Sequence, residues 1–176
     1  KNIKTPKYGR AKRIEHAISI FKKIRAPAIM KPLESSGSKG IFLIKDENEI
    51  KEYFENSKQF SSGEKGIILE EFIGGLEIGG ETLIWKNELV FFQITNKFKN
   101  KYFVPIGHSL PSTLPLKIQE KVRNLITKAI KVLNIENGAL NFDVIIDTNR
   151  EPVIVELGAR LGGNCLPTIM HLQTNV

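Results

Sequence analysis

The chain has 176 residues, of which 41% are hydrophobic and 26% charged, and its formal net charge is +7. This length and composition suit an ordinary globular domain with a hydrophobic core, and they exclude a disordered chain. The apolar runs are short and interrupted by charge, so we expect no membrane span, and no basic-then-apolar segment indicates a secretory signal. A cytoplasmic protein is therefore expected. The single cysteine, Cys165, excludes an internal disulfide and a cysteine-built metal cluster.

The positive charge is concentrated at the start of the chain. Residues 1–31 contain ten Lys or Arg and one acid, Glu15, whereas the remaining 145 residues contain 16 basic and 18 acidic side chains. Many of the basic residues decorate an amphipathic helix that we expect over residues 11–25. Both a solvated helix face and a nucleic-acid surface are compatible with this pattern. The solvated face is favoured, because the basic stretch lacks interleaved stacking aromatics other than Tyr8.

Hydrophobic periodicity predicts strands that alternate with helices. The expected strands in the first part of the chain are residues 26–32, 41–44, 66–73, 77–86 and 89–97. A second helix is expected from Asp46, which can cap it together with Glu49. Asn87 and Glu88 are expected to form the turn of a hairpin, and Trp85 is assigned to the core.

The second half of the chain begins with an unusually long connection. Residues 99–114 are expected to be irregular, and such long loops usually bind something. Residues 116–133 carry apolar side chains at 3.6-residue spacing and predict a helix. A β-hairpin follows. Helices mixed with antiparallel hairpins predict an α+β fold of two small lobes, residues 1–74 and 75–176.

The last hairpin raises a chemical question, because two acids fall within it. If residues 148–151 form the loop, Asp147 faces Pro152, and one face of both strands is wholly apolar. Asp143 then lies directly across from Glu156 on the other face, where the two carboxylates repel each other. A divalent cation such as Mg²⁺ would remove this repulsion. Two acids that simply face solvent are the alternative, and the pattern alone does not separate the two interpretations.

Two lysines suggest contacts with an anion. Lys31 ends a buried strand, where an ammonium group needs an anionic partner or a route to water. Lys39 lies in the loop 34–40, whose two glycines and three hydroxyls leave backbone N–H groups that could close over phosphates. The loop lacks Walker A spacing, and Ser- and Gly-rich surface turns are common, so it does not identify a phosphate site alone.

Five segments of the chain, taken in their order, resemble the motifs of a known family. They read "PAIMKP", "SSGSKG", "LEEFIGGLEIGGE", "NGALNFDVIID" and "PVIVELGARLGG". In this order they resemble the ATP-grasp superfamily, and within it the carboxylate-amine (or carboxylate-thiol) ligases with a carbamoyl-phosphate-synthetase-like domain. The match covers about residues 5 to 168 and keeps the family separations of thirteen between Asp143 and Glu156 and seven between Glu70 and Glu77. The resemblance implies an ATP-grasp fold, in which two lobes clasp ATP.

The resemblance also implies roles for individual residues. The nucleotide-binding set that it implies is Lys31, Ser36, Gly37, Ser38, Lys39, Glu70, Glu71, Phe72, Ile73 and Glu77. Within this set the lysines contact phosphates, the carboxylate of Glu70 and the backbone of Phe72 and Ile73 meet adenine, and Glu77 holds the ribose hydroxyls. Lys39 is also implied to be catalytic.

The implied metal ligands are Asp143 and Glu156, with Mg²⁺ as the cation and Mn²⁺ as a possible substitute. Arg160 corresponds to the arginine of the family's Arg-x-Gly-Gly run, a catalytic position near the transferred phosphate or the acyl substrate. The segment "FVPIGHSLPS" resembles the ligases' variable loop over the acceptor site, which makes Lys97 and His108 candidate substrate contacts. A histidine satisfied by the backbone is the alternative for His108.

The activity that the resemblance implies is ATP- and Mg²⁺-dependent joining of a small-molecule carboxylate to an amine through an acyl phosphate. Two departures from the family pattern weaken the expectation of this activity. Gly158 occupies a position where relatives commonly have a metal-binding asparagine, and Asn141, across from it, could supply the oxygen instead. The family's preceding domain is also missing, so we expect an excised module, truncated at its C-terminus. A non-catalytic nucleotide-binding fragment is the alternative, a nucleic-acid-binding module is less favoured, and the oligomeric state is left open.

Overall fold

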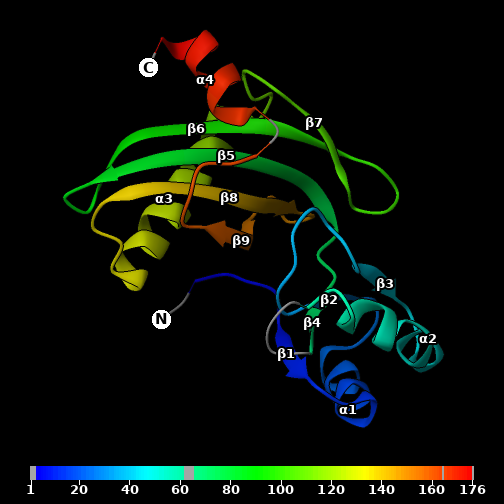
Figure 1. Ribbon diagram of the computed structural model, residues 1–176. Helices are drawn as coiled ribbons and strands as arrows, with labels where there is room; N and C mark the ends of the chain where they lie inside the picture. Colours follow the sequence, from blue (N-terminus) through cyan, green and yellow to red (C-terminus); the bar gives the residue numbers. More distant parts are fainter. Residues whose placement is uncertain (1–2, 62–65, 164, 176) are drawn as a thin grey trace. The chain divides into compact units, whose positions relative to one another are not determined.

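The computed structural model describes residues 3–61, 66–163 and 165–175 (Figure 1). The described residues form two compact units. The larger unit comprises residues 3–5, 74–98 and 107–175, apart from residue 164, and the smaller unit comprises residues 6–73, apart from 62–65, together with residues 99–106. Strands and helices are mixed in an α+β fold, as expected. None of the described helices is long and apolar enough to cross a membrane.

The smaller unit is a four-stranded antiparallel sheet with two helices. Its strands lie in the order β1-β4-β2-β3, and its helices follow β1 and β3 along the chain. The elements are β1 (Tyr8–Ala11), α1 (Ile14–Ile24), β2 (Ala28–Pro32), β3 (Phe42–Ile44), α2 (Glu47–Lys58) and β4 (Ile67–Glu71).

The core of the smaller unit follows from the alternation of side chains along its strands. Met30 and Leu69, which pair across β2 and β4, are fully buried and cluster with Phe21 of α1 and Phe54 of α2. The alternate positions, among them Lys31, belong to the opposite face of the sheet, because successive side chains of a strand point to opposite sides. One face of the sheet is therefore covered by the two helices, while the other carries Lys31 and Glu70 beside the partly buried Ile29 and Ile68.

The larger unit is a five-stranded antiparallel sheet with the order β7-β6-β5-β8-β9. Its elements are β5 (Gly75–Trp85), β6 (Glu88–Lys99), β7 (Pro105–Ser109), α3 (Leu116–Leu133), β8 (Gly138–Asp147), β9 (Pro152–Gly158) and α4 (Leu166–Thr174). Helix α3 lies along one face of this sheet, and its Val122 and Ile126 are buried against Phe142 and Val144 of β8 (Figure 1).

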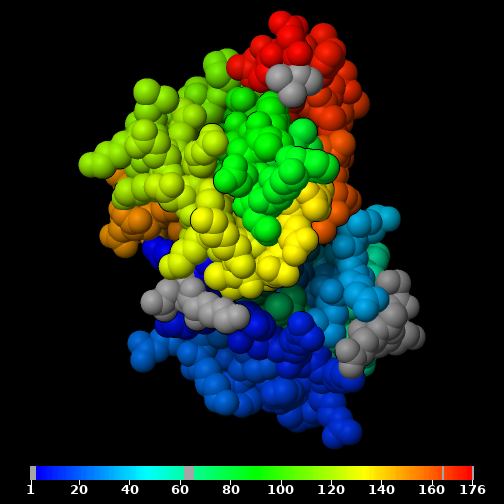
Figure 2. Space-filling view, turned by 90° about the vertical axis from the view of Figure 1, so that its left-hand side faces the viewer, coloured from blue at the N-terminus to red at the C-terminus, as the bar shows by residue number. Residues whose placement is uncertain are grey.

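The turn between β5 and β6 packs beside the connection from α3 to β8. The backbone N–H of Asn87 donates to the carbonyl oxygen of Glu136, and that of Lys86 donates to Oδ1 of Asn137. Figure 2 shows the green hairpin residues against the yellow residues that follow α3. Trp85, at this end of β5, is 60% exposed, so its assignment to the core was wrong.

Several sequence-based elements are confirmed, and others were missed. The helix at residues 116–133 is observed with those bounds, and the side chain of Asp46 caps α2 by accepting from the N–H groups of Asn48 and Glu49. The segment 99–114 is not wholly irregular, because it contains β7. Strand β1 and helix α4 were not predicted.

The predicted register of the β8–β9 hairpin agrees with the structure around Asp143 and is off by one residue near the turn. Asp143 pairs with Glu156 and Asn141 with Gly158, as expected. A bulge then intervenes, so Val144 pairs with Ile154 and not with Val155. A bulge adds one residue to one strand, and this moves Ile154 into the core in place of Val155.

Candidate functional site

An ion cluster occupies the face of the larger sheet opposite α3. The Nζ atom of Lys97 lies 2.6 Å from Oδ2 of Asp143 and 2.8 Å from Oε1 of Glu77. The Lys97 side chain is only 8% exposed, whereas the two carboxylates are partly open to solvent. Three adjacent strands, β6, β5 and β8, thus bring together residues that lie up to 66 positions apart in the chain.

The charge of Lys97 is stabilised by this arrangement. Burial lowers the pKa of Lys97, but the attraction of Asp143 and Glu77, and their hydrogen bonds with its ammonium group, outweigh that effect and raise the pKa overall. Lys97 is therefore a permanent cation at neutral pH, fixed between two acids. The sequence placed Lys97 near a substrate, but it contained no signal that this side chain bridges Glu77 and Asp143.

Two carboxylates, those of Asp143 and Glu156, are the side chains that could hold a divalent cation in the larger unit. Glu156 lies directly opposite Asp143, and its side chain is exposed. Because Lys97 contacts Oδ2 of Asp143, Oδ1 is the carboxylate oxygen that remains for a metal. The described residues include no group of three or more His, Cys, Asp or Glu side chains that could hold a metal ion. Two carboxylates nevertheless suit Mg²⁺, which completes its shell with water and phosphate oxygens.

The third expected ligand, Asn141, is held by the neighbouring strand. Its Nδ2 donates to the carbonyl oxygen of Gly80 over 3.0 Å, and its backbone pairs with that of Gly158. This hydrogen bond fixes which end of the amide is the donor, so Oδ1 is the ligand atom that Asn141 has to offer.

His108 lies beside the same cluster, on the edge strand β7. Its Nδ1 is 2.8 Å from Oγ1 of Thr95, so a side chain, and not the backbone alone, satisfies the ring. Burial lowers the pKa of His108, and the charge of Lys97 lowers it further, while Asp143 and Glu77 act in the opposite direction. His108 is therefore expected to be neutral at pH 7.

The loop that carries Arg160 folds back onto the same sheet. Nη1 of Arg160 donates to the carbonyl oxygen of Leu161, and the N–H of Gly162 donates to Oε1 of Glu81. Glu81 is 2% exposed, and burial raises its pKa, against the opposing effects of the Gly162 hydrogen bond and the Arg160 charge. Sequence reasoning missed Glu81, because a carboxylate at an alternating strand position is usually exposed.

In the smaller unit, the two residues expected near phosphate and adenine contact each other. Nζ of Lys31 lies 2.8 Å from Oε2 of Glu70, and both side chains are largely buried. They reach each other diagonally across β2 and β4, since Glu70 pairs with Ile29 and Lys31 with Ile68. Glu70 is thus the anionic partner that the position of Lys31 called for.

The glycine-rich loop is a compact turn. Gly37, Ser38 and Gly40 all have positive φ, and a Cβ at Gly40 would lie 2.7 Å from Cδ2 of Phe60 and 2.9 Å from Cγ of Pro32. Oγ of Ser38 donates to the carbonyl oxygen of Phe103, which ties this loop to residues 99–106. Ser36 and Lys39 are exposed in the same turn.

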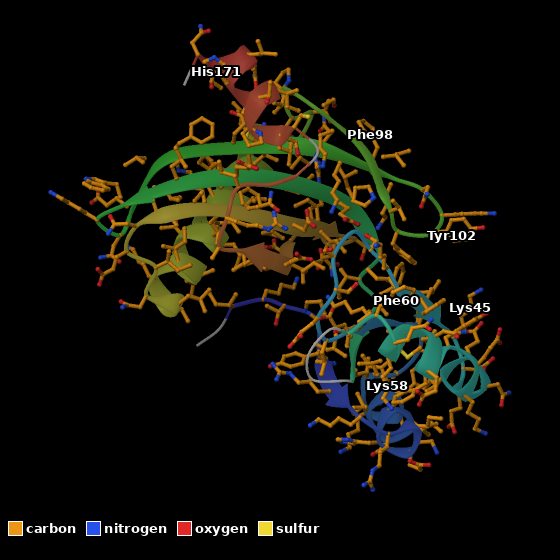
Figure 3. The ribbon with its side chains drawn as sticks, viewed as in Figure 1. Lys45, Lys58, Phe60, Phe98, Tyr102 and His171 are labelled. Atoms are coloured by element: carbon orange, nitrogen blue, oxygen red, sulfur yellow. The ribbon has the colours of Figure 1, made fainter. Side chains whose placement is uncertain are left out.

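The segment of residues 99–106 exposes an aromatic side chain to solvent. Tyr102 is 64% exposed and points outward (Figure 3).

The segment expected to meet adenine is partly used by the protein itself. The N–H of Phe72 donates to the carbonyl oxygen of Pro27, and the N–H of Glu71 donates to that of Lys7. Phe72 can therefore offer a ligand only its carbonyl oxygen. A pocket of about 540 Å³ opens beside this segment. It is lined by Lys7, Lys23, Ile24, Arg25, Ala26, Pro27, Glu71 and Phe72.

Comparison with known proteins places these features in a family. Residues 24–168 match the model of the ATP-grasp domain. The chain is 31% identical over 183 positions to a formate-dependent phosphoribosylglycinamide formyltransferase of Prochlorococcus marinus, and the match covers 98% of this chain and 44% of the relative. It is 28% identical to dapdiamide A synthase of Enterobacter agglomerans over 82% of this chain and 35% of that protein.

A solved structure shares the fold. The biotin carboxylase domain of the 2-oxoglutarate carboxylase of Hydrogenobacter thermophilus, crystallised with MgADP, ADP and bicarbonate, superimposes with a TM-score of 0.84. The identity is 21%, and the match covers 99% of this chain and 40% of that one. The chain spans less than half of the length of each of these relatives. With the family model matched over most of its residues, the chain belongs to the ATP-grasp family.

Proposed function

We propose that this chain is the ATP-binding part of an ATP- and Mg²⁺-dependent ligase that joins a small-molecule carboxylate to an amine. The observation that carries the proposal is the placement of Glu77, Lys97, Asp143 and Glu156 on one face of the larger sheet. Family membership and the two related enzymes support it, one of which is named for a reaction that depends on formate, a carboxylate.

Residues of each unit have a proposed role in nucleotide binding. In the smaller unit, Lys31 would contact a phosphate, and Ser36, Gly37, Ser38 and Lys39 would cover the phosphates with backbone N–H groups. The Glu70 carboxylate and the backbone of residues 71–73 would meet adenine. In the larger unit, Glu77 would hold the ribose hydroxyls while Lys97 keeps its carboxylate oriented.

The residues that would hold Mg²⁺ are Asp143 and Glu156, with Oδ1 of Asn141 as a third ligand. Bound there, the cation would neutralise charge on the phosphate oxygens. Mn²⁺ has similar oxygen-ligand preferences and is proposed as a substitute. We place the reaction in the cytoplasm, where Mg-ATP is available.

The proposed chemistry is transfer of the γ-phosphoryl group of ATP to the substrate carboxylate. The amine then attacks the acyl carbon, phosphate leaves with the bonding electron pair, and the nitrogen loses a proton. Phosphoryl transfer of this kind requires mainly positioning and electrostatic stabilisation. Arg160 and Lys39 would supply positive charge at the transferred group. His108, neutral at pH 7 and beside Lys97, would line the site of the carboxylate or amine.

A nucleotide-binding module without turnover is a second candidate, and the observation that favours it is Gly158. This residue offers no side-chain oxygen opposite Asn141, where relatives commonly have an additional ligand. Nucleotide binding without ADP formation in the presence of carboxylates and amines would favour this candidate over the ligase.

The experiment that tests nucleotide binding is calorimetric titration of the chain with ATP, with and without Mg²⁺. We expect micromolar, Mg²⁺-dependent binding that the double substitution Asp143→Asn, Glu156→Gln abolishes. The matched control is Glu88→Gln, Glu136→Gln, which removes two negative charges at exposed positions of the same unit, away from the polar face. Equal loss of affinity in both double variants would contradict the assignment of the metal site.

A further inference from the structure

Glu81 is the one acidic side chain among the buried polar residues of the described structure. Its Oε1 accepts the N–H of Gly162 over 2.5 Å, between residues 81 positions apart. Transfer of a carboxylate from water into a protein interior is unfavourable unless hydrogen bonds replace the lost hydration. A buried ionic group is therefore weak evidence for a role in stability, and an apolar side chain would fill the same position at no such cost.

The loop after β9 approaches Glu81 more closely than any side chain at position 162 would allow. A Cβ atom on Gly162 would lie 2.4 Å from Oε1 of Glu81 and 2.7 Å from Nδ2 of Asn141. Both distances are far below van der Waals contact. Glycine at position 162 thus lets its N–H reach the buried carboxylate without a shift of Glu81 or Asn141.

The position of Glu81 in the sheet connects it with the residues of the proposed site. Glu81 pairs with Asn141, which pairs with Gly158, so these three residues form one row across β5, β8 and β9. Asp143 and Glu156 form the next row on the same face, because they lie two residues further along their strands. The loop therefore contacts the sheet at Glu81, in the row next to the two carboxylates.

The side chain of Arg160 is hydrogen-bonded within this loop. Its Nη1 donates to the carbonyl oxygen of the next residue, Leu161. The charge of Arg160 also lies close enough to Glu81 to favour the ionised carboxylate. An interaction that holds residues 159–163 consequently restricts where the guanidinium of Arg160 can lie relative to Asp143 and Glu156.

We propose that Glu81 is a positioning residue that holds the loop of residues 159–163, through the N–H of Gly162, so that Arg160 faces an anionic group bound beside Asp143 and Glu156. The effect on ligand binding rests on the proposed function, and the anionic group is the terminal phosphate of ATP. The hold on the loop itself is independent of that function.

The first readout is amide hydrogen exchange of the ligand-free chain. In Glu81→Ala the exchange of Gly162 and its neighbours should accelerate about tenfold or more, because the amide loses its acceptor. In Glu81→Gln most of the protection should remain, since the amide oxygen of Gln can still accept. The control is Thr82→Val, which removes the hydrogen bond from buried Thr82 to the carbonyl oxygen of Phe91 on the other face of the same strand.

The second readout is the affinity for Mg-ATP. Glu81→Ala and Arg160→Ala should each weaken binding, and the double variant should be no weaker than Arg160→Ala alone, because both changes remove the same interaction. If Glu81→Ala does not fold, Gly162→Ala is used in its place, since the added methyl group would meet Oε1 of Glu81 and disturb its hydrogen bond with the N–H of residue 162.

Unchanged exchange at Gly162 in Glu81→Ala, relative to Thr82→Val, would overturn the proposal. Additive losses of Mg-ATP affinity would also overturn it, because they would show that Arg160 does not act through Glu81. If the unmodified chain does not bind Mg-ATP, the proposed function fails, and the exchange measurement still decides whether Glu81 holds the loop.

Discussion

Lys97 shows how a single side chain connects the nucleotide and metal roles that we propose for the larger unit. Its ammonium group contacts both Glu77, assigned to ribose, and Asp143, assigned to the metal. Two carboxylates held this close would repel each other without a cation between them. Lys97 thus permits the fold to place two acids together before any ligand binds.

Replacement of Lys97 by Met should lower the free energy of unfolding by about 3 kcal/mol, because it leaves two partly buried carboxylates without their counter-charge. Mg²⁺ should restore part of this loss, and it should stabilise Lys97→Met more than the unmodified chain. Urea unfolding with and without MgCl₂ measures both effects. Lys121→Met is the control, since the pair of Lys121 with Glu151 is more exposed and should contribute less than about 1 kcal/mol. Equal stabilisation of both variants by Mg²⁺ would contradict this account.

His108 gives the larger unit a pH dependence whose sign follows from its environment. Its pKa is lowered from 6.5 in the folded protein, first by burial and then by Lys97. Below pH 6.5 the unfolded chain binds a proton more readily than the folded chain, so stability should rise with pH from the folded pKa up to about 6.5. The slope of the unfolding free energy over this window should flatten in His108→Asn. The control is the substitution of the exposed helix residue His16 by Gln, and an equal change of slope in both variants would contradict the assignment to His108.

At the scale of elements, local sequence signals were most reliable where a hydrogen bond links near neighbours. Asp46 caps α2 through the N–H groups of Asn48 and Glu49, as its spacing predicted. The bulge in β9 could not be predicted, because Val153, Ile154 and Val155 are all apolar and alternation alone does not reveal which of them is the extra residue. Strand β1 was missed because Tyr8–Ala11 is only four residues long and contains a Gly and an Arg, so it shows no apolar alternation.

Substitution of Asp46 by Ala should destabilise the protein by about 1 kcal/mol, the usual effect of losing an N-cap acceptor. Chemical unfolding followed by circular dichroism measures this change. Asn48→Ala is a matched control in the first turn of α2, because Asn48 takes part in the cap through its backbone and its side chain is exposed. A loss in Asp46→Ala no larger than in Asn48→Ala would show that the cap contributes nothing.

At the scale of the whole molecule, the two units have separate hydrophobic cores. The core of the larger unit is built from α3 and strands β5, β6, β8 and β9, whereas that of the smaller unit is built mainly from α1, α2, β2 and β4. Residues 99–106 run from the last residue of β6 into β7 and are part of the smaller unit, where the carbonyl oxygen of Phe103 accepts the hydrogen bond of Ser38. No local pattern indicates that this segment belongs to the smaller unit, because its membership depends on contacts such as the one between Ser38 and Phe103, 65 positions apart.

The sequence by itself determined the α+β class, the bounds of α3 and the pairing of Asp143 with Glu156, because each depends on periodicity or on spacing within short segments. It also indicated the family, through the order of five short segments along the chain. Only the tertiary structure decided that Lys97 bridges Glu77 and Asp143, and that Glu81 is buried beneath the loop of Arg160. The physical reason is that burial and ion pairing depend on which distant segments come together. A lysine or glutamate at an alternating strand position reads the same in the sequence, whether it faces water or a folded loop.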